Sequence, residues 1–115
     1  MDVVIYHNPR CSKSRQTLDL LRQHAIEPSI VEYLKTPPHA QALADILGLL
    51  NMEPRELMRK NEPVYRDLGL EDPGLSRAAL IQAMTANPIL IERPIVLANG
   101  KAALGRPPEN VLSIL

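Results

Sequence analysis

Apolar residues along this chain change their period several times, and these changes divide it into strands and helices. A short apolar run at residues 3–6 predicts a buried strand, and residues 12–24 then follow the 3.6-residue period of an amphipathic helix. Alternation at residues 29–34 predicts a second strand. The early part of the chain is therefore a strand–helix–strand unit, which requires a parallel, right-handed crossover.

The middle of the chain shows helical patterns only. Thr36 is expected to cap a helix that has Pro37 at its first position, and apolar residues then recur on one face up to Leu50. Three further helical segments are expected, at residues 54–59, 64–68 and 76–84, the last of them capped by Ser76.

The last part of the chain predicts a hairpin followed by a helix. Residues 94–98 and 101–104 are strand-like, and the Asn99-Gly100 pair between them is a strong signal for a two-residue turn. A final helix is expected at residues 108–115. The simplest architecture is one α/β domain over residues 1–115: a four-stranded mixed sheet covered by helices, the thioredoxin-like layout, with a helical insertion at about 37–87 between strands two and three.

Composition narrows the classes of partner. The 115 residues include 13 basic and 13 acidic ones, three Tyr, and no Phe or Trp. Balanced charge and few aromatic side chains argue against a nucleic-acid partner. The longest apolar runs are far shorter than the ~20 residues that span a bilayer, and the chain does not open with a secretory signal. We expect a cytoplasmic monomer that binds neither nucleic acid nor membrane.

The chain has a single cysteine, Cys11, which excludes an intrachain disulfide. Its spacing from the three histidines, His7, His24 and His39, matches no zinc motif. We therefore expect no metal and no bound cofactor.

Cys11 lies in the loop between the first strand and the helix that begins near Ser12, where Ser12 or Ser14 could supply the cap. This is the carboxyl edge of the sheet, where α/β folds bind ligands. Free N–H groups and the partial positive charge of a helix amino end stabilise a thiolate, so the pKa of Cys11 should fall below the usual ~8.5. The same groups would attract an oxyanion.

The cationic surroundings of Cys11 decide between two interpretations. A lone cysteine is often a small buried hydrophobic residue, but such a residue needs no basic neighbours. Here Arg10, Lys13 and Arg15 flank the thiol. A reactive thiolate is the interpretation that these neighbours favour.

Spacing then excludes two familiar thiol chemistries. Ser14 stands where a Cys-x-x-Cys motif needs its second thiol, and Thr17 stands where a Cys-x5-Arg phosphatase motif needs arginine. The site must therefore be monothiol. A two-electron reduction would need an external thiol such as glutathione, and an external thiol reductase to clear the mixed disulfide.

Four motifs in order resemble the glutaredoxin-dependent arsenate reductases, the ArsC family, and most closely its compact bacterial branch. They are Tyr6-His7-Asn8-Pro9-Arg10-Cys11-Ser12-Lys13-Ser14-Arg15, Leu57-Met58-Arg59-Lys60-Asn61, Glu92-Arg93-Pro94-Ile95-Val96 and Gly105-Arg106-Pro107. The resemblance extends from the first strand to the end of the chain, and it implies a thioredoxin-like fold.

The resemblance also implies roles for particular residues. Cys11 would attack arsenate, with His7 helping to lower its pKa, and glutathione as co-substrate and glutaredoxin as transient partner would complete reduction to arsenite. Arg59, Arg93 and Arg106 would bind the oxyanion, and Asn8, Ser14, Arg15 and a cis Pro94 would support the loop.

The residues alone support the arginine roles unequally. Arginine suits tetrahedral oxyanions because its planar fork donates two hydrogen bonds at once. Arg93 and Arg106 each precede a proline, which keeps their backbone extended at the ends of the hairpin. Arg59, near a helix end, has the alternative of being a solvated surface group.

Two alternative functions remain open on the sequence. One is a general glutathione-linked monothiol oxidoreductase that acts on another substrate. The other is a regulator that binds RNA polymerase, as in the Spx-like branch of the fold. That branch uses a Cys-x-x-Cys switch, which Ser14 removes here.

Overall fold

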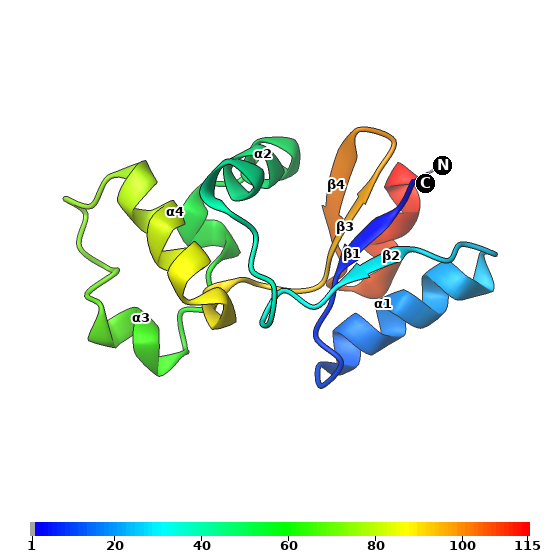
Figure 1. Ribbon diagram of the computed structural model, residues 1–115, viewed down its shortest axis with the longest axis horizontal. Coiled ribbons are helices and arrows are strands. Elements are labelled where there is room, and N and C mark those ends of the chain that lie inside the picture. Colours follow the sequence, from blue (N-terminus) through cyan, green and yellow to red (C-terminus); the bar gives the residue numbers. More distant parts are fainter. Residues whose placement is uncertain (1) are drawn as a thin grey trace. The chain divides into compact units, whose positions relative to one another are not determined.

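The computed structural model describes residues 2–115. The chain forms two compact units: one combines Met1–Thr36 with Arg93–Leu115, and the other is Pro37–Glu92. Figure 1 shows the sheet within the first unit and the helices of the second. The regular elements of the second unit, Pro37–Glu92, are all helices, as the sequence pattern indicates.

The first unit is built on a four-stranded mixed sheet. Its strands are β1 (Val4–Tyr6), β2 (Ser29–Val31), β3 (Ile95–Ala98) and β4 (Lys101–Leu104), in the spatial order β2-β1-β3-β4. β1 pairs in parallel with β2 and antiparallel with β3, which pairs antiparallel with β4. The α/β class and the mixed sheet expected from the sequence are confirmed.

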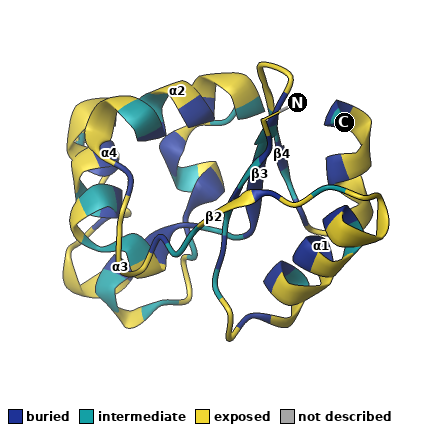
Figure 2. Ribbon diagram, turned by 45° about the vertical axis from the view of Figure 1, so that its right-hand side comes forward, coloured by how far each residue is buried: buried dark blue, intermediate teal, exposed yellow. Residues whose placement is uncertain are grey.

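Two helices bury one face of this sheet, α1 (Ser12–Gln23) and the 3-10 helix η3 (Pro108–Ile114). Ile5, Val96 and Ala103 form a row across three adjacent strands, since Ile5 is in register with Val96 and Val96 with Ala103. Leu21 of α1 and Val111 of η3 are fully buried in the same cluster. Figure 2 shows this buried side of α1. The core therefore holds the start of α1 at a set position beside β1.

The hairpin turns as expected. Asn99 and Gly100 both have positive φ, 55° and 71°, the geometry that a two-residue turn between twisted strands requires. The Asn99 side chain also donates a 2.8 Å hydrogen bond to the carbonyl of Ile114, which ties the turn to η3.

The second unit is a small helical cluster. It contains α2 (Ala40–Leu50), η1 (Pro54–Leu57), α3 (Pro63–Asp67), α4 (Arg77–Ala86) and η2 (Pro88–Leu90). Two backbone hydrogen bonds join distant parts of it, from Arg59 to the carbonyl of Leu90 (2.7 Å) and from Glu92 to that of Leu57 (2.8 Å). Ser76 caps α4 as expected, its hydroxyl accepting from the Ala79 N–H.

The start of α2 differs from the expectation. The helix begins at Ala40, and the imidazole Nδ1 of His39 caps it by accepting a 3.2 Å hydrogen bond from the Ala42 N–H. Pro38 explains why Pro37 cannot open the helix, because a residue before proline is driven out of the helical region. His39 is exposed.

The first helix also differs at its cap. Cys11 itself occupies the cap position of α1 with extended backbone, and no side chain caps the helix. Neither Ser12 nor Ser14 takes that role, because the Ser14 hydroxyl is engaged by His7 and by the Asn8 N–H. The expectation of a serine cap was wrong.

Two elements differ from the prediction, one in its length and the other in its type of helix. The second strand ends at Val31, because the N–H groups of Lys35 and Thr36 turn back to the carbonyl of Glu32. The last helix is a 3-10 helix rather than an α-helix. Over the described residues, no helix has the length and apolar character needed to cross a bilayer.

Candidate functional site

The turn that precedes α1 holds Cys11 in place. The Cys11 N–H donates to the carbonyl of Asn8 (3.0 Å), and the Arg15 N–H donates to the carbonyl of Cys11 (3.0 Å), which begins the helix. Only 7% of Cys11 is exposed. A cysteine at this position presents its sulfur to the free N–H groups of the first helical turn.

The surroundings of the sulfur favour the thiolate. Burial alone would raise the pKa of Cys11, but the backbone N–H groups of Ser14 and Lys13 and the charges of Arg93 and Arg106 outweigh it. The net effect is a pKa below the usual value. The direction agrees with the sequence analysis, and the dominant helpers are backbone donors and two distant arginines.

Arg106 is the side chain that reaches the sulfur. Its Nη1 lies 4.0 Å from Cys11 Sγ and also donates to the carbonyl of Arg93 (3.2 Å). The peptide bonds before Pro94 and Pro107 are both cis. The expected cis Pro94 is confirmed, and the second cis bond was not foreseen. The structure thus brings Arg93 and Arg106 to Cys11, although 82 or more residues separate them in sequence.

His7 acts on the loop through Ser14. The His7 Nδ1 and the Ser14 hydroxyl are hydrogen-bonded at 2.6 Å, and the same hydroxyl accepts from the Asn8 N–H at 3.0 Å. His7 and Ser14 are both buried. Burial is the main cause that lowers the pKa of His7; Glu32 opposes it, and Arg22 and Arg15 add to it. The lowered pKa favours the neutral form of His7. In that form His7 orients Ser14, the residue whose backbone N–H faces the Cys11 sulfur.

Arg15 and Asn8 support the loop through its backbone. Arg15 Nη1 donates to the carbonyl of Pro9 (3.0 Å), and Asn8 Oδ1 accepts from the Arg10 N–H (3.0 Å). Arg15 is thus turned to the loop backbone.

The sequence analysis missed Thr17 and Gly105 as parts of the site. Thr17 is fully buried, and its hydroxyl donates to the carbonyl of Lys13 at 2.8 Å and lies 3.5 Å from that of Gly105. The Gly105 N–H donates to the carbonyl of Pro94 (2.9 Å). These contacts join the helix that carries Cys11 to the residues adjoining Arg93 and Arg106. A glycine directly before Arg106 was the available signal.

Arg59 belongs to the second unit, Pro37–Glu92. Its guanidinium pairs with the Glu62 carboxylate at 2.8 Å, and both side chains are mostly buried. The alternative of a freely solvated surface arginine does not fit this pairing. Its role toward an oxyanion remains a prediction.

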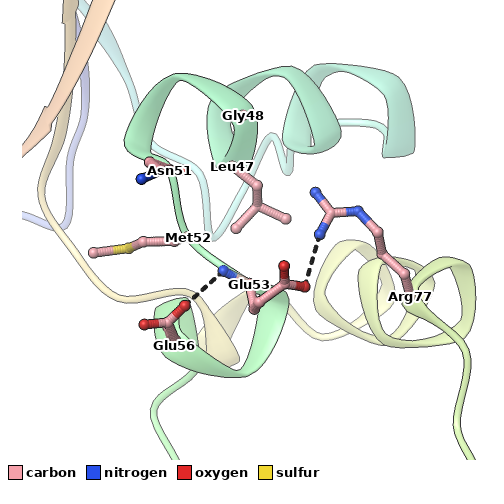
Figure 3. Close-up of a pocket in the computed structure, with 7 residues that line it drawn as sticks. All are labelled: Leu47, Gly48, Asn51, Met52, Glu53, Glu56 and Arg77. Atoms are coloured by element: carbon pink, nitrogen blue, oxygen red, sulfur yellow. Dashed lines mark hydrogen bonds and ion pairs between the residues drawn. The ribbon is translucent and has the colours of Figure 1, made fainter.

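Each unit has a hollow on its surface. The first unit has one of about 280 Å³ beside the loop before Cys11. The second has one of about 330 Å³ beside Glu53, shown in Figure 3. There the Glu53 carboxylate accepts from Arg77 (3.1 Å), and Glu56 accepts from the Glu53 N–H (2.8 Å). The charges at this second hollow are thus engaged in holding η1 to α4.

Among residues 2–115, His, Cys, Asp and Glu side chains form no group of three or more that could hold a metal ion.

Fold and site together define a thioredoxin-like α/β protein with one cysteine at the amino end of its first helix and two arginines from the opposite end of the chain beside it. The sequence model of the ArsC family matches residues 6–114, and the chain belongs to that family.

Close relatives cover the whole chain. The Escherichia coli K12 protein YfgD, described as uncharacterized, is 60% identical over 98% of this chain and 96% of its own length. An arsenate reductase of Neisseria meningitidis serogroup B is 49% identical over 99% and 98%. The solved structure of the arsenate reductase from Vibrio cholerae is 52% identical, covers 100% of this chain and 98% of its own, and superposes with a TM-score of 0.97. The resemblance found in the sequence is confirmed.

Proposed function

We propose that the protein is an arsenate reductase that uses the Cys11 thiolate as nucleophile, glutathione as co-substrate and glutaredoxin as transient partner. The observation that carries the proposal is the approach of Arg106 Nη1 to within 4.0 Å of Cys11 Sγ at the amino end of α1. A thiolate and a fork of N–H donors at one point suit a reaction in which sulfur attacks a tetrahedral oxyanion.

The first half of the proposed reaction forms two sulfur–arsenic bonds. The Cys11 thiolate attacks arsenate, an As–O bond breaks, and the oxygen leaves as water. The glutathione thiolate then attacks the same arsenic, and a second oxygen leaves as water. Arsenic is still As(V) after both steps, because each one exchanges an oxygen for a sulfur.

The second half transfers the electrons. A glutaredoxin thiolate attacks the glutathione sulfur, an S–S bond forms, and the pair of the breaking As–S bond stays on arsenic, which becomes As(III). The two thiols are oxidised to a mixed disulfide between glutaredoxin and glutathione. Water then hydrolyses the Cys11–arsenic bond, which releases arsenite and restores the thiol.

The arginines supply the electrostatic part of the proposed mechanism. Arg93 and Arg106 would hold the arsenate oxygens and stabilise the charge that develops on them, with Arg59 as the third donor. Guanidinium groups fit this task because their donors lie in a fixed plane and keep their charge at every physiological pH. His7, through Ser14, would keep the N–H groups of the first turn aimed at the sulfur.

A coupled assay tests the proposal. The protein is mixed with glutathione, glutaredoxin, glutathione reductase and NADPH, and NADPH oxidation is followed with and without arsenate. We expect consumption only with arsenate, no consumption with Cys11→Ser, and a loss of roughly 100-fold or more for Arg93→Ala or Arg106→Ala.

A matched control is Arg22→Ala, which removes an exposed arginine of the same helix that pairs with Glu27. It should leave the arsenate-dependent rate unchanged. NADPH consumption that depends on Cys11 but not on arsenate would contradict the proposal, and it would favour the general glutathione-linked oxidoreductase instead.

A further inference from the structure

We propose that the 280 Å³ hollow beside the loop before Cys11 is the binding site for glutathione, and that it recognises the γ-glutamyl end of the tripeptide. One wall of the hollow is residues 7–10, and the other is formed by Glu32, Leu34 and Lys35. This inference rests on the proposed function for its ligand, and it assigns that ligand a place.

The topology puts this hollow beside the turn that carries the reacting cysteine. β1 and β2 are parallel, so the segments after them leave the sheet at the same edge, and the His7 N–H donates to the carbonyl of Val31 at 2.8 Å. The crevice outside the carboxyl ends of parallel strands is where α/β folds bind ligands. Asn8 lies in the wall of the hollow, and its carbonyl accepts from the Cys11 N–H (3.0 Å), so the wall is the turn that carries the thiol.

The charges of the hollow match those of the tripeptide. Glutathione has two carboxylates and one ammonium group, and the hollow is lined by two cations, Arg10 and Lys35, and one anion, Glu32. Lys35 Nζ lies 3.6 Å from Glu32 Oε1, so the hollow presents a cation directly beside an anion. The α-amino acid end of glutathione presents the complementary pair, a carboxylate directly beside an ammonium group. Leu34, with 42% of its surface exposed, offers apolar contact to the methylenes of the ligand.

These positions determine an orientation. Lys35 would bind the γ-glutamyl carboxylate and Glu32 the ammonium beside it, while Arg10 would bind the glycine carboxylate. The central cysteine of glutathione would then lie along residues 8–10, the backbone segment that directly precedes Cys11. The volume lies near the lower end of the ~300–1,000 Å³ typical of ligand sites, so part of the tripeptide remains in contact with solvent.

Binding of S-methylglutathione tests this site without any redox chemistry, because the thioether cannot react. Isothermal titration should give a dissociation constant for the reduced protein that rises about three- to fivefold in Lys35→Ala and in Arg10→Ala, the size expected for one exposed charge pair. Lys101→Ala removes a distant exposed cation of β4 and should leave the constant unchanged. Amide signals of residues 8–10 and 32–35 should shift on titration.

A truncated ligand sharpens the test. S-methylcysteinylglycine lacks the γ-glutamyl group, so Lys35→Ala should weaken its binding by no more than Lys101→Ala does, while Arg10→Ala should still weaken it. Equal loss of both ligands in Lys35→Ala, or no loss of either in Lys35→Ala and Arg10→Ala, would overturn the proposal.

The two proposals fail in different ways. If arsenate is not reduced but S-methylglutathione binds with these variant effects, the arsenate reductase proposal falls and the glutathione site stands. If arsenate is reduced but the KM for glutathione is the same in Lys35→Ala, Arg10→Ala and the unmodified protein, the site falls and the reductase stands.

Discussion

Gly105 and Thr17 lie so close together that a methyl group on Gly105 would sit 2.6 Å from the Thr17 hydroxyl oxygen. The same methyl group would lie 2.8 Å from Cγ of Pro94. Thr17 belongs to the helix that begins at Cys11, and Gly105 directly precedes Arg106. The absence of a side chain at position 105 therefore sets how near the guanidinium can come to the sulfur.

Gly105→Ala should weaken both folding and the thiolate. Crowding against a buried threonine and a proline ring should cost about 1–3 kcal/mol in the free energy of unfolding, and the displaced Arg106 should let the pKa of Cys11 rise. Urea unfolding measures the first effect, and the pH dependence of Cys11 alkylation measures the second.

Gly48→Ala is the matched control for that variant. A methyl group there would have no neighbour within 4 Å, and Gly48 lies inside α2. Alanine in a helix is favoured over glycine by roughly 0.5–1 kcal/mol, so this variant should be slightly more stable with unchanged alkylation. Equal behaviour of the two alanine variants would contradict the close approach at Gly105.

The pH dependence of alkylation reports directly on Cys11. The thiolate is the reactive form, so the rate with iodoacetamide should rise with pH through a midpoint below that of a free thiol. Arg106→Gln removes one of the stabilising charges and should move that midpoint upward. Arg22→Gln, which removes a charge from the far end of α1, should leave it in place.

The same pKa shift has a consequence for stability. Because the thiol of Cys11 has a lower pKa folded than unfolded, its contribution is fully present above the unfolded value of ~8.5 and is lost as pH falls through the folded value. Relative to Cys11→Ser, the unmodified protein should therefore gain free energy of unfolding as pH rises over that window. A constant difference at all pH values would show that the thiol titrates alike in both states.

His7 should make the fold sensitive to acid. Burial lowers its pKa in the folded protein, so the unfolded chain takes up the proton first. Stability is complete above the unfolded value of ~6.5 and declines as pH falls from there toward the folded value. His7→Asn, whose amide can replace Nδ1 beside Ser14, should flatten this decline in urea unfolding measured between pH 7 and pH 5. An unchanged slope would mean that His7 is not the group that titrates.

Ser14→Ala tests the contact between His7 and Ser14. The substitution removes the partner of the buried His7 Nδ1 and the acceptor of the Asn8 N–H, which should cost about 1–3 kcal/mol in the free energy of unfolding. Ser113→Ala, at an exposed serine that bonds its own 3-10 helix, should have a much smaller effect. A raised alkylation midpoint in Ser14→Ala alone would tie this contact to the thiolate.

His39 is expected to stabilise α2 as its cap. His39→Ala should lower the free energy of unfolding by roughly 1 kcal/mol, because the Ala42 N–H loses its acceptor, and His39→Asp should restore it. Thr36→Ala, at the position where the sequence alone suggests the cap, should change stability by less than about 0.5 kcal/mol. The reverse order of the two alanine variants would place the cap at Thr36.

Local sequence was sufficient for most elements of the fold. The turn at Asn99-Gly100, the cap at Ser76 and the strand–helix–strand start each depend on residues within a few positions of one another. The cap of α2 also depends on a local effect, that of Pro38 on Pro37. The cap of α1 escaped prediction for a different reason. Ser14 is engaged by His7, seven positions earlier, and competition between possible partners for one hydroxyl is decided by packing.

The sequence alone determined that this protein has a single thiol, at the start of a helix in an α/β fold, because the period of apolar residues and the position of Cys11 are both local properties. It took the tertiary structure to show that Arg106 reaches that thiol while the charge of Arg93 lowers its pKa, that Ser14 faces His7, and that Gly105 lies against Thr17. The physical reason is that each of these contacts depends on the pairing of β1 with β3 and on the packing of α1, which no local pattern encodes.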